Sequence, residues 1–212
     1  MKSKLTFLIG AILLFAVWFT YWLGNRSDDL EYWAALALDQ EEGKRTAAHA
    51  VFVRALSSPD PKVRAYGARL LHTAPKDNDA VVQGLLGTLR DSDSDVRQAS
   101  AFALGSIRPE SPDVIRCLLL LLDDSNGEVS VSAANALARY SPLNEDVVKE
   151  LIHIIELQGL QARFSAIRVL QAQGTDAAPA LPVLLRIVDN QEPGWRMAER
   201  AICRIHDPMP PL

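Results

Sequence analysis

A nine-residue pattern that recurs every 33 residues constrains this chain more than any other feature of its sequence. The pattern is apolar at its ends, and small residues dominate its fifth, sixth and eighth positions. The copies are LEYWAALAL from Leu30, VRAYGARLL from Val63, VRQASAFAL from Val96, VSVSAANAL from Val129, ARFSAIRVL from Ala162 and a degenerate GWRMAERAI from Gly194. A repeat of this length is typical of stacked supersecondary units, so it predicts a solenoid.

An apolar stripe precedes most copies of the pattern. Its residues follow the offsets i, i+1, i+4, i+5 and i+8, which place them on one wide face of a helix. The stripes are Val81, Val82, Leu85, Leu86, Leu89; Val114, Ile115, Leu118, Leu119, Leu122; Val147, Val148, Leu151, Ile152, Ile155; Ala180, Leu181, Leu184, Leu185, Val188; and a weaker first copy, Ala48, His49, Phe52, Val53, Leu56. Each repeat is therefore predicted to be a helical hairpin. We call its first helix the A helix and its second, which carries the nine-residue pattern, the B helix.

The turns between these segments carry helix-capping residues. Asp60, Asp93 and Asn126 stand three residues before their B helices, where a side-chain oxygen accepts hydrogen bonds from free helix N–H groups. Asn78 and Ser111 are predicted to begin A helices in the same way. The chain shows no strand-like alternation of any length, so we expect an all-α fold. The fourth repeat departs from the pattern, with Gly159 in place of the capping residue and with Leu157 and Leu160 where other turns are acidic.

The segment Asp93–Gly105, DSDVRQASAFALG, resembles the second helix of a HEAT-like repeat, of the short bacterial kind related to phycobilin-lyase repeats. The resemblance covers about residues 43–206 together with a half repeat at residues 30–38. It implies a right-handed α-solenoid of about five HEAT-like hairpins. The ankyrin signature Thr-Pro-Leu-His and the tetratricopeptide Trp/Gly/Tyr pattern do not occur in the sequence.

The N-terminal segment predicts a membrane anchor. Residues 5–23 are uncharged and span about 28 Å as a helix, close to the hydrocarbon thickness of a bilayer. Lys2 and Lys4 precede the segment, and Trp18, Tyr21 and Trp22 crowd its far end. We therefore expect a retained signal anchor with the N-terminus in the cytoplasm and the solenoid in the periplasm of a bacterium. A cleaved signal peptide is the alternative reading of the same segment.

The repeat register divides the rest of the chain. Leu30–Leu38 is in register with the B helices but has no soluble A helix before it, so we interpret it as a half-repeat cap. The predicted organisation is a transmembrane helix at 1–24, a juxtamembrane cap at 25–42, a solenoid at 43–206 and a Pro-rich tail at 207–212.

Charge and composition argue against several kinds of function. Beyond Gly24 the chain holds 20 basic and 26 acidic residues, which is a poor match to nucleic acid. No histidine is followed by Glu, so the di-iron site of HEAT-like deoxyhypusine hydroxylases is not expected. Asp91–Asp95 imitates the start of a calcium loop, but Val96 and Phe102 occupy positions that need Gly and Glu, so turn and capping roles explain it better. We expect no cofactor, no metal and no disulfide between Cys117 and Cys203.

Two sets of arginines recur in the B helices. Arg64, Arg97 and Arg163 share position 2 of the pattern, with Ser130 interrupting, and we interpret them as a structural ladder that pairs with turn carboxylates. Positions 3, 7 and 10 are predicted to point away from the core. The candidate partner-binding residues on that side are Phe102, Val131, Phe164, Arg69, Arg168, Arg196 and Arg200. Exposed aromatics flanked by arginines are typical of interface hot spots, although packing between repeats also accounts for Phe102 and Phe164.

The sequence thus favours a noncatalytic protein- or peptide-binding scaffold or assembly factor in the bacterial inner membrane, in contact with lipid through residues 5–23. Two alternatives stay open. The resemblance implies a lyase-like or chaperone-lyase role, which requires a bound tetrapyrrole. A HEAT-like nucleic-acid-modifying enzyme requires a basic concave face and a cytoplasmic domain.

Overall fold

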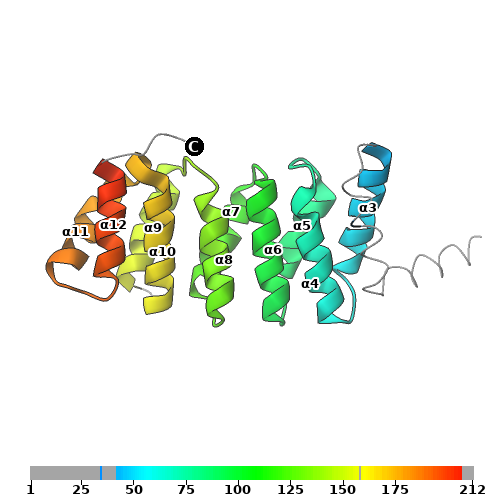
Figure 1. Cartoon of the computed structure of the whole chain (residues 1–212), viewed down its shortest axis with the longest axis horizontal. Coiled ribbons are helices and arrows are strands. Elements are labelled where there is room, and N and C mark those ends of the chain that lie inside the picture. Colours follow the sequence, from blue (N-terminus) through cyan, green and yellow to red (C-terminus); the bar gives the residue numbers. More distant parts are fainter. Residues whose placement is uncertain (1–33, 35–41, 158, 207–212) are drawn as a thin grey trace, which may run out of the picture.

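The computed structural model describes Ala34 and residues 42–157 and 159–206, and all regular structure in this part of the chain is helical. The helices pair into hairpins that follow one another in chain order along the long axis (Figure 1). The A helices are α3 (Glu42–Ala55), α5 (Asp79–Thr88), α7 (Pro112–Leu120), α9 (Glu145–Leu157) and α11 (Leu181–Asp189). The B helices are α4 (Pro61–Leu70), α6 (Ser94–Ile107), α8 (Gly127–Ala138), α10 (Leu160–Gln173) and α12 (Trp195–His206). Short 3₁₀ helices are η1 (Leu71–Thr73), η2 (Leu121–Asp123) and η3 (Gly174–Ala180).

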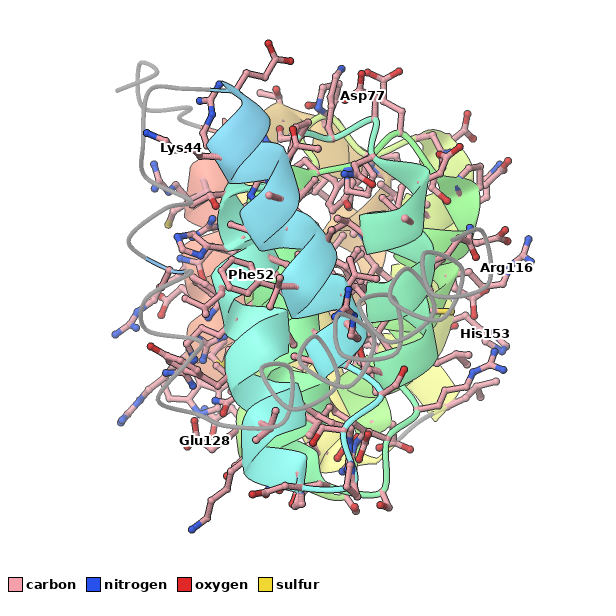
Figure 2. The ribbon with its side chains drawn as sticks, turned by 90° about the vertical axis from the view of Figure 1, so that its right-hand side faces the viewer. Lys44, Phe52, Asp77, Arg116, Glu128 and His153 are labelled. Atoms are coloured by element: carbon pink, nitrogen blue, oxygen red, sulfur yellow. The ribbon has the colours of Figure 1, made fainter. Side chains whose placement is uncertain are left out.

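The B helices form one layer and the A helices the other. Each B helix packs against the next along the array, from α4 to α12, and each also packs against the A helix of its own hairpin. Contacts between A helices are sparser and are clearest between α3 and α5 and between α9 and α11. Figure 2 looks along the array from the α3 end, and Arg116 of α7 and His153 of α9 project together from the A-helix side. The predicted repeat solenoid is confirmed.

The core follows the predicted stripes. Val81, Leu85, Leu118 and Leu151 are fully buried, and the first, weaker stripe buries Phe52 completely. The stripe of the last A helix is an exception, because Leu185 is 46% exposed although the pattern places it inward. No later hairpin among the described residues packs against α11. The face of α11 that would contact a following hairpin is therefore exposed to solvent.

Small residues bring neighbouring B helices close together. A Cβ atom added at Gly105 of α6 would lie 2.6 Å from both Cα and Cβ of Ala136 in α8. No side chain fits in that space, so this glycine is required by the contact between the two helices. Gly105 is position 10 of its B helix and is buried, so the expectation that position 10 points away from the core is wrong in α6. Ala133 and Ala134 are likewise completely buried, which confirms that the small positions of the pattern serve packing.

Most predicted caps form. The carboxylate of Asp60 accepts a hydrogen bond from the Lys62 N–H, and that of Asp93 accepts from the N–H groups of Asp95 and Val96. Asn126 and Asn78 cap their helices with the side-chain amide oxygen. Helix α7 begins after Ser111 as predicted, with Pro112 as its first residue, but the Ser111 side chain makes no capping hydrogen bond. Pro112 has no N–H group, so the first turn of α7 has one fewer N–H group that lacks a hydrogen-bond partner.

The predicted membrane segment, residues 5–23, and the Pro-rich tail lie outside the described residues. None of the helices in the described part is long and apolar enough to cross a bilayer. Of the predicted half-repeat cap only Ala34 is described. It is helical, half-buried and packed against the hydrophobic core.

The close contact at Gly105 gives a test of the packing. We expect Gly105→Ala to lower the thermal midpoint clearly, because the new methyl group meets the backbone of Ala136 and forces α6 and α8 apart; overpacking of this kind costs about 1–3 kcal/mol. Gly87→Ala is the matched control. Gly87 lies in α5 with no atom within 4 Å of an added Cβ, so alanine should be neutral or stabilising there. Equal midpoints for the two variants in thermal unfolding would contradict this packing.

Candidate protein-binding surface

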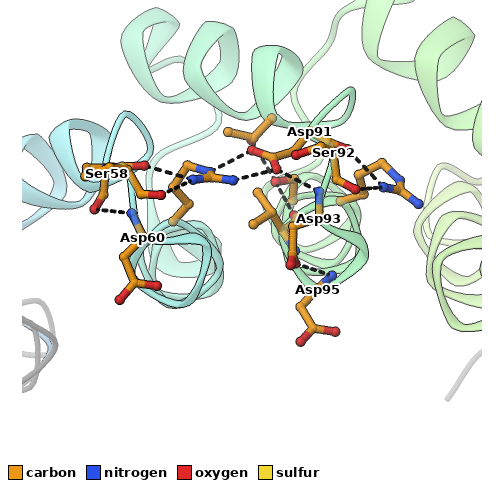
Figure 3. Close-up of polar contacts among 12 residues, drawn as sticks. Ser58, Asp60, Asp91, Ser92, Asp93 and Asp95 are labelled. Carbon is orange, nitrogen blue, oxygen red and sulfur yellow. Dashed lines mark hydrogen bonds and ion pairs between the residues drawn. The ribbon is translucent and has the colours of Figure 1, made fainter.

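Two arginines at position 2 of the B helices tie consecutive hairpins together. Arg64 of α4 donates from Nε and Nη2 to the two carboxylate oxygens of Asp91, both at 2.8 Å, and Asp91 belongs to the next hairpin. Arg97 of α6 makes the same pair of 2.8 Å bonds to Asp124. The remaining Nη1 of each arginine donates to two backbone carbonyls of its own turn, as Figure 3 shows for this region. The predicted structural ladder is confirmed.

The side chains of these ion pairs are largely buried, and the pKa values of their carboxylates are lowered. The side chains of Arg97 and Asp124 are 13% and 8% exposed. The hydrogen bond from Arg64 holds the pKa of Asp91 below its usual range, against the opposing effect of burial. Burial alone would raise the pKa of Asp124, but hydrogen bonds from Arg97 and from the Asn126 N–H outweigh it, and the pKa is lowered. Asp91 and Asp93 thus serve the ladder and a helix cap, which confirms the expected turn and capping role of this acidic segment.

The ladder is interrupted between the third and fourth hairpins, and both partners are missing there. Ser130 stands where Arg64 and Arg97 stand, and Leu157 occupies the position that corresponds to Asp91 and Asp124. Instead, the Ser130 hydroxyl lies 2.6 Å from the hydroxyl of Ser165 and donates to the Leu122 carbonyl. Leu157 is left 68% exposed. The ladder resumes at Arg163, which bonds the Ile155 carbonyl and Glu192 of the last hairpin.

The other recurring side chains, at position 7, lie on the open side of the B helices. We call Arg69, Phe102, Asn135, Arg168 and Arg200 the position-7 column. All five side chains are exposed, and each comes from a different B helix. The guanidinium groups of Arg69, Arg168 and Arg200 form no hydrogen bond or ion pair with any described residue, in contrast to the fully bonded arginines of the ladder.

Phe102 is the aromatic centre of this column. Its side chain is 42% exposed, with the His72 ring at 5.8 Å and the Arg139 guanidinium 6.0 Å from the ring centroid. Beside it, Gly105, Ser132 and Asn135 help to line a small cavity of about 170 Å³ between α6 and α8. His72 lies in η1 at position 10, on the predicted outward side, but was not among the predicted binding residues; Arg139 directly follows α8, beyond the positions considered.

The other predicted binding residues differ in exposure. Val131 and Phe164 are half-buried, and the edge of the Phe164 ring lies 3.0 Å from where a Cβ of Gly194 would stand, so this ring packs on the turn before α12. Arg196 is exposed, with its guanidinium 5.1 Å from the Trp195 ring centroid. The structure thus places all seven predicted residues on the B helices, with Phe102 open to solvent and Phe164 partly engaged in packing.

The B-helix side is basic, although the chain as a whole carries a formal charge of −4. Beyond their first turns, the described B helices expose Arg69, Arg168, Arg200 and Arg204 against the single carboxylate of Glu199. We call this side, with the position-7 column along it, the B face. Its charge and its exposed aromatic ring favour a ligand that carries carboxylates and an apolar side chain.

Comparisons with known proteins support the fold. Residues 49–138 match the sequence model of HEAT repeats. No curated protein matches the chain. HEAT-like repeats are therefore supported for residues 49–138, while the narrower resemblance to the phycobilin-lyase type stays a prediction.

Several solved structures share the architecture. A computationally designed armadillo repeat protein for modular peptide recognition superposes with a TM-score of 0.52 at 16% identity, over 84% of this chain and 92% of that one. A second designed armadillo repeat protein gives a TM-score of 0.52 at 15% identity, over 88% and 98% of the two chains. An engineered protein solved by a structural genomics consortium gives 0.51 at 21% identity, over 84% and 96%. At these identities the likeness shows a shared helical-repeat solenoid and no more.

The lowered pKa values of Asp91 and Asp124 give a test of the ladder by pH. A carboxylate whose pKa is lower in the folded state stabilises the fold above its unfolded pKa of about 3.9, and that contribution is lost as the pH falls through the folded value. Asp91→Asn with Asp124→Asn should therefore reduce stability near pH 6 by about 2 kcal/mol per pair, and by progressively less as the pH falls below the unfolded value. Denaturant titrations at pH 6 and at pH 3 measure the difference.

The control for this test is Glu145→Gln. Glu145 forms a fully exposed pair with Lys149 on one helix, which contributes little to stability in water. Its substitution should change the unfolding free energy only slightly at any pH. An effect of the Asp91 and Asp124 substitutions that is equally large at pH 6 and at pH 3 would argue against the ladder as the source of the stabilisation.

Proposed function

We propose that this chain is a noncatalytic scaffold or assembly factor that binds an acidic segment of a partner protein along the B face. The observation that carries the proposal is the contrast between the two arginine columns. At position 2 the guanidinium groups of Arg64 and Arg97 are fully occupied by carboxylates and carbonyls of the fold. At position 7 those of Arg69, Arg168 and Arg200 have no partner among the described residues and face solvent.

Unpaired guanidinium groups suit carboxylate ligands. Arginine presents its N–H groups in a planar fork that matches a carboxylate in two parallel hydrogen bonds. The exposed Phe102 ring adds an apolar contact within the same column, and the small cavity beside it offers space for one side chain. A ligand of this surface therefore combines acidic groups with at least one apolar anchor, which complements the arginine and aromatic side chains of the B face.

The spacing of the column suits an extended peptide. Neighbouring packed helices lie about 8–10 Å apart, and an extended chain advances about 3.3 Å per residue, so every third residue of the peptide meets the next B helix. Read along the column, this predicts an acidic residue opposite Arg69, an apolar one opposite Phe102 and acidic ones opposite Arg168 and Arg200. One of the similar solved structures is a designed protein for modular peptide recognition, which supports peptide binding as a use of this architecture.

The proposal includes a membrane tether. Residues 5–23 are long and apolar enough to cross a bilayer, and the positive charges before them favour an N-terminus in the cytoplasm. The solenoid would then stand in the periplasm close to the bacterial inner membrane, since few residues separate the predicted anchor from the repeats. A partner bound on the B face would be held near the membrane surface.

Truncating the B face should weaken binding without unfolding the protein. We expect Arg168→Ala and Phe102→Ala each to reduce the affinity for the captured partner about 30-fold, the size of a hot-spot loss of about 2 kcal/mol, with thermal midpoints close to wild type because both side chains are exposed. The partner is obtained by affinity purification from detergent-solubilised membranes and identified by mass spectrometry, and its binding to each variant is then titrated.

Two matched variants sharpen this experiment. Arg90→Ala removes an exposed arginine at the end of an A helix and should leave binding unchanged. Phe164→Ala should lower the thermal midpoint more than Phe102→Ala does, because its ring packs against Gly194. If capture survives both Arg168→Ala and Phe102→Ala, the B face is not the binding surface.

The tether is tested by topology. An alkaline phosphatase fused to the C-terminus should be active, because that enzyme folds only in the oxidising periplasm, and a cytoplasmic fluorescent reporter at the same position should be dark. Exchanging Lys2 and Lys4 for Glu should weaken this orientation. An inactive phosphatase together with a bright cytoplasmic reporter would overturn the proposed location.

A further inference from the structure

A second candidate surface lies in the other layer, between α7 and α9. There a groove of about 970 Å³ runs between the two A helices. Its walls include Ile115 and Leu119 of α7 and Val147 and Ile154 of α9, and Tyr140 contributes to its lining. It is far larger than the small cavity on the B face, and the arginines proposed to bind there do not line it.

The groove lies at the junction where the arginine ladder is interrupted. Arg64–Asp91 joins the first two hairpins, and Arg97–Asp124 joins the second and third. The third and fourth hairpins, which contain α7 and α9, have Ser130 and Leu157 in the corresponding positions. The two hairpins are joined mainly through α8 and α10, while α7 and α9 stay far enough apart to leave the groove between them.

The groove opens to solvent on the A-helix side. Leu120, at the end of α7, lines the groove and is 68% exposed, and Arg116, Asp146 and Glu150 on its rim are also exposed. Leu120 is thus an exposed apolar side chain beside the groove, and no described residue covers it. Burying such a side chain against an apolar partner would favour association.

The rim of the groove is acidic on balance. Its lining includes four carboxylates against two guanidinium groups, those of Arg108 and Arg116. Glu110 is already paired with Lys76, and Arg116 with Asp113. Asp123 and Glu150 form no ion pair within the described part of the chain, so these two carboxylates are available to a cationic ligand.

We propose that this groove binds an amphipathic helix of a partner protein, with its apolar stripe between α7 and α9 and with Lys or Arg residues beside Glu150 and Asp123. The shape favours a helix, because the channel follows α7, whose nine residues extend about 13 Å. That length matches apolar anchors at i, i+4 and i+7, which is the usual spacing when a helix binds in a groove. The site is separate from the B face, so the two surfaces are able to engage different segments.

A library of helical peptides tests the proposal. Each 20-residue peptide carries a fixed leucine stripe at i, i+4 and i+7 and randomised flanking positions, and the library is selected on the full-length chain in lipid nanodiscs. We expect the selected peptides to be enriched in Lys and Arg on one flank. Leu120→Asp and Glu150→Lys should each lower their affinity at least tenfold, with unchanged thermal midpoints because both side chains are exposed.

Two control variants separate this site from the B face. Leu185→Asp changes an exposed leucine of similar character on α11, and Arg168→Glu reverses a charge on the B face; neither should affect the selected peptides. The proposal is overturned if no peptide is enriched, if the selected flanks are acidic, or if binding survives Leu120→Asp. Peptides that lose binding only with Arg168→Glu belong to the B face and also count against a site in the groove.

Discussion

The ion pair between position 2 of one B helix and the turn of the next hairpin is the interaction on which the regular part of this array depends. Arg97 satisfies both oxygens of Asp124 and two carbonyls of its own turn in one planar arrangement. Each such pair fixes the distance and the register between two hairpins at their turn ends, while glycine and alanine set the approach of the helix axes. Because the groups are mostly shielded from water, the loss of one partner would leave the other poorly solvated.

This arrangement gives the arginines of the B helices two different roles. Those at position 2 are consumed by the fold and stabilise it. Those at position 7 have no partner within the part of the chain that the structure describes, so they add positive charge to one side of an acidic protein at little cost to its stability. A solenoid repeats both positions every 33 residues, and the periodic scaffold therefore presents a periodic surface. The regular pattern is interrupted at Ser130 and Leu157. The ion pair between the two hairpins is missing there, and the apolar side chain of Leu157 is exposed to solvent.

Much of the fold could be predicted from the sequence, because the repeat fixes which residues face inward. The buried stripes, the caps at Asp60, Asp93 and Asn126 and the pairing of the position-2 arginines all follow from local spacing. The outward direction of position 7 follows in the same way. The exposure of Leu185 was not anticipated, because it depends on which of the described hairpins pack against α11 rather than on the residue's own repeat.

The candidate site was less predictable, since it depends on contacts between repeats. His72 and Arg139 approach Phe102 from the ends of neighbouring B helices, outside the nine-residue pattern. The packing of Phe164 against Gly194 joins two different repeats and therefore cannot be deduced from the pattern of either one. Ser130 and Leu157 each stood out in the sequence as irregular. That they occupy the two halves of one missing ion pair becomes clear only from the 27-residue separation that joins Arg64 to Asp91 and Arg97 to Asp124.

The most direct test of this account is a double-mutant cycle on Arg97 and Asp124, measured as unfolding free energies of the wild type, Arg97→Ala, Asp124→Ala and the double variant. The exposed pair Lys76–Glu110, which also joins neighbouring hairpins, serves as the reference cycle. We predict a coupling energy of about 1.5–3 kcal/mol for Arg97–Asp124 and a clearly smaller one for Lys76–Glu110, whose charges are screened by water. A coupling energy for Arg97–Asp124 no larger than that of the exposed pair would contradict the claim that the ladder holds the hairpins together.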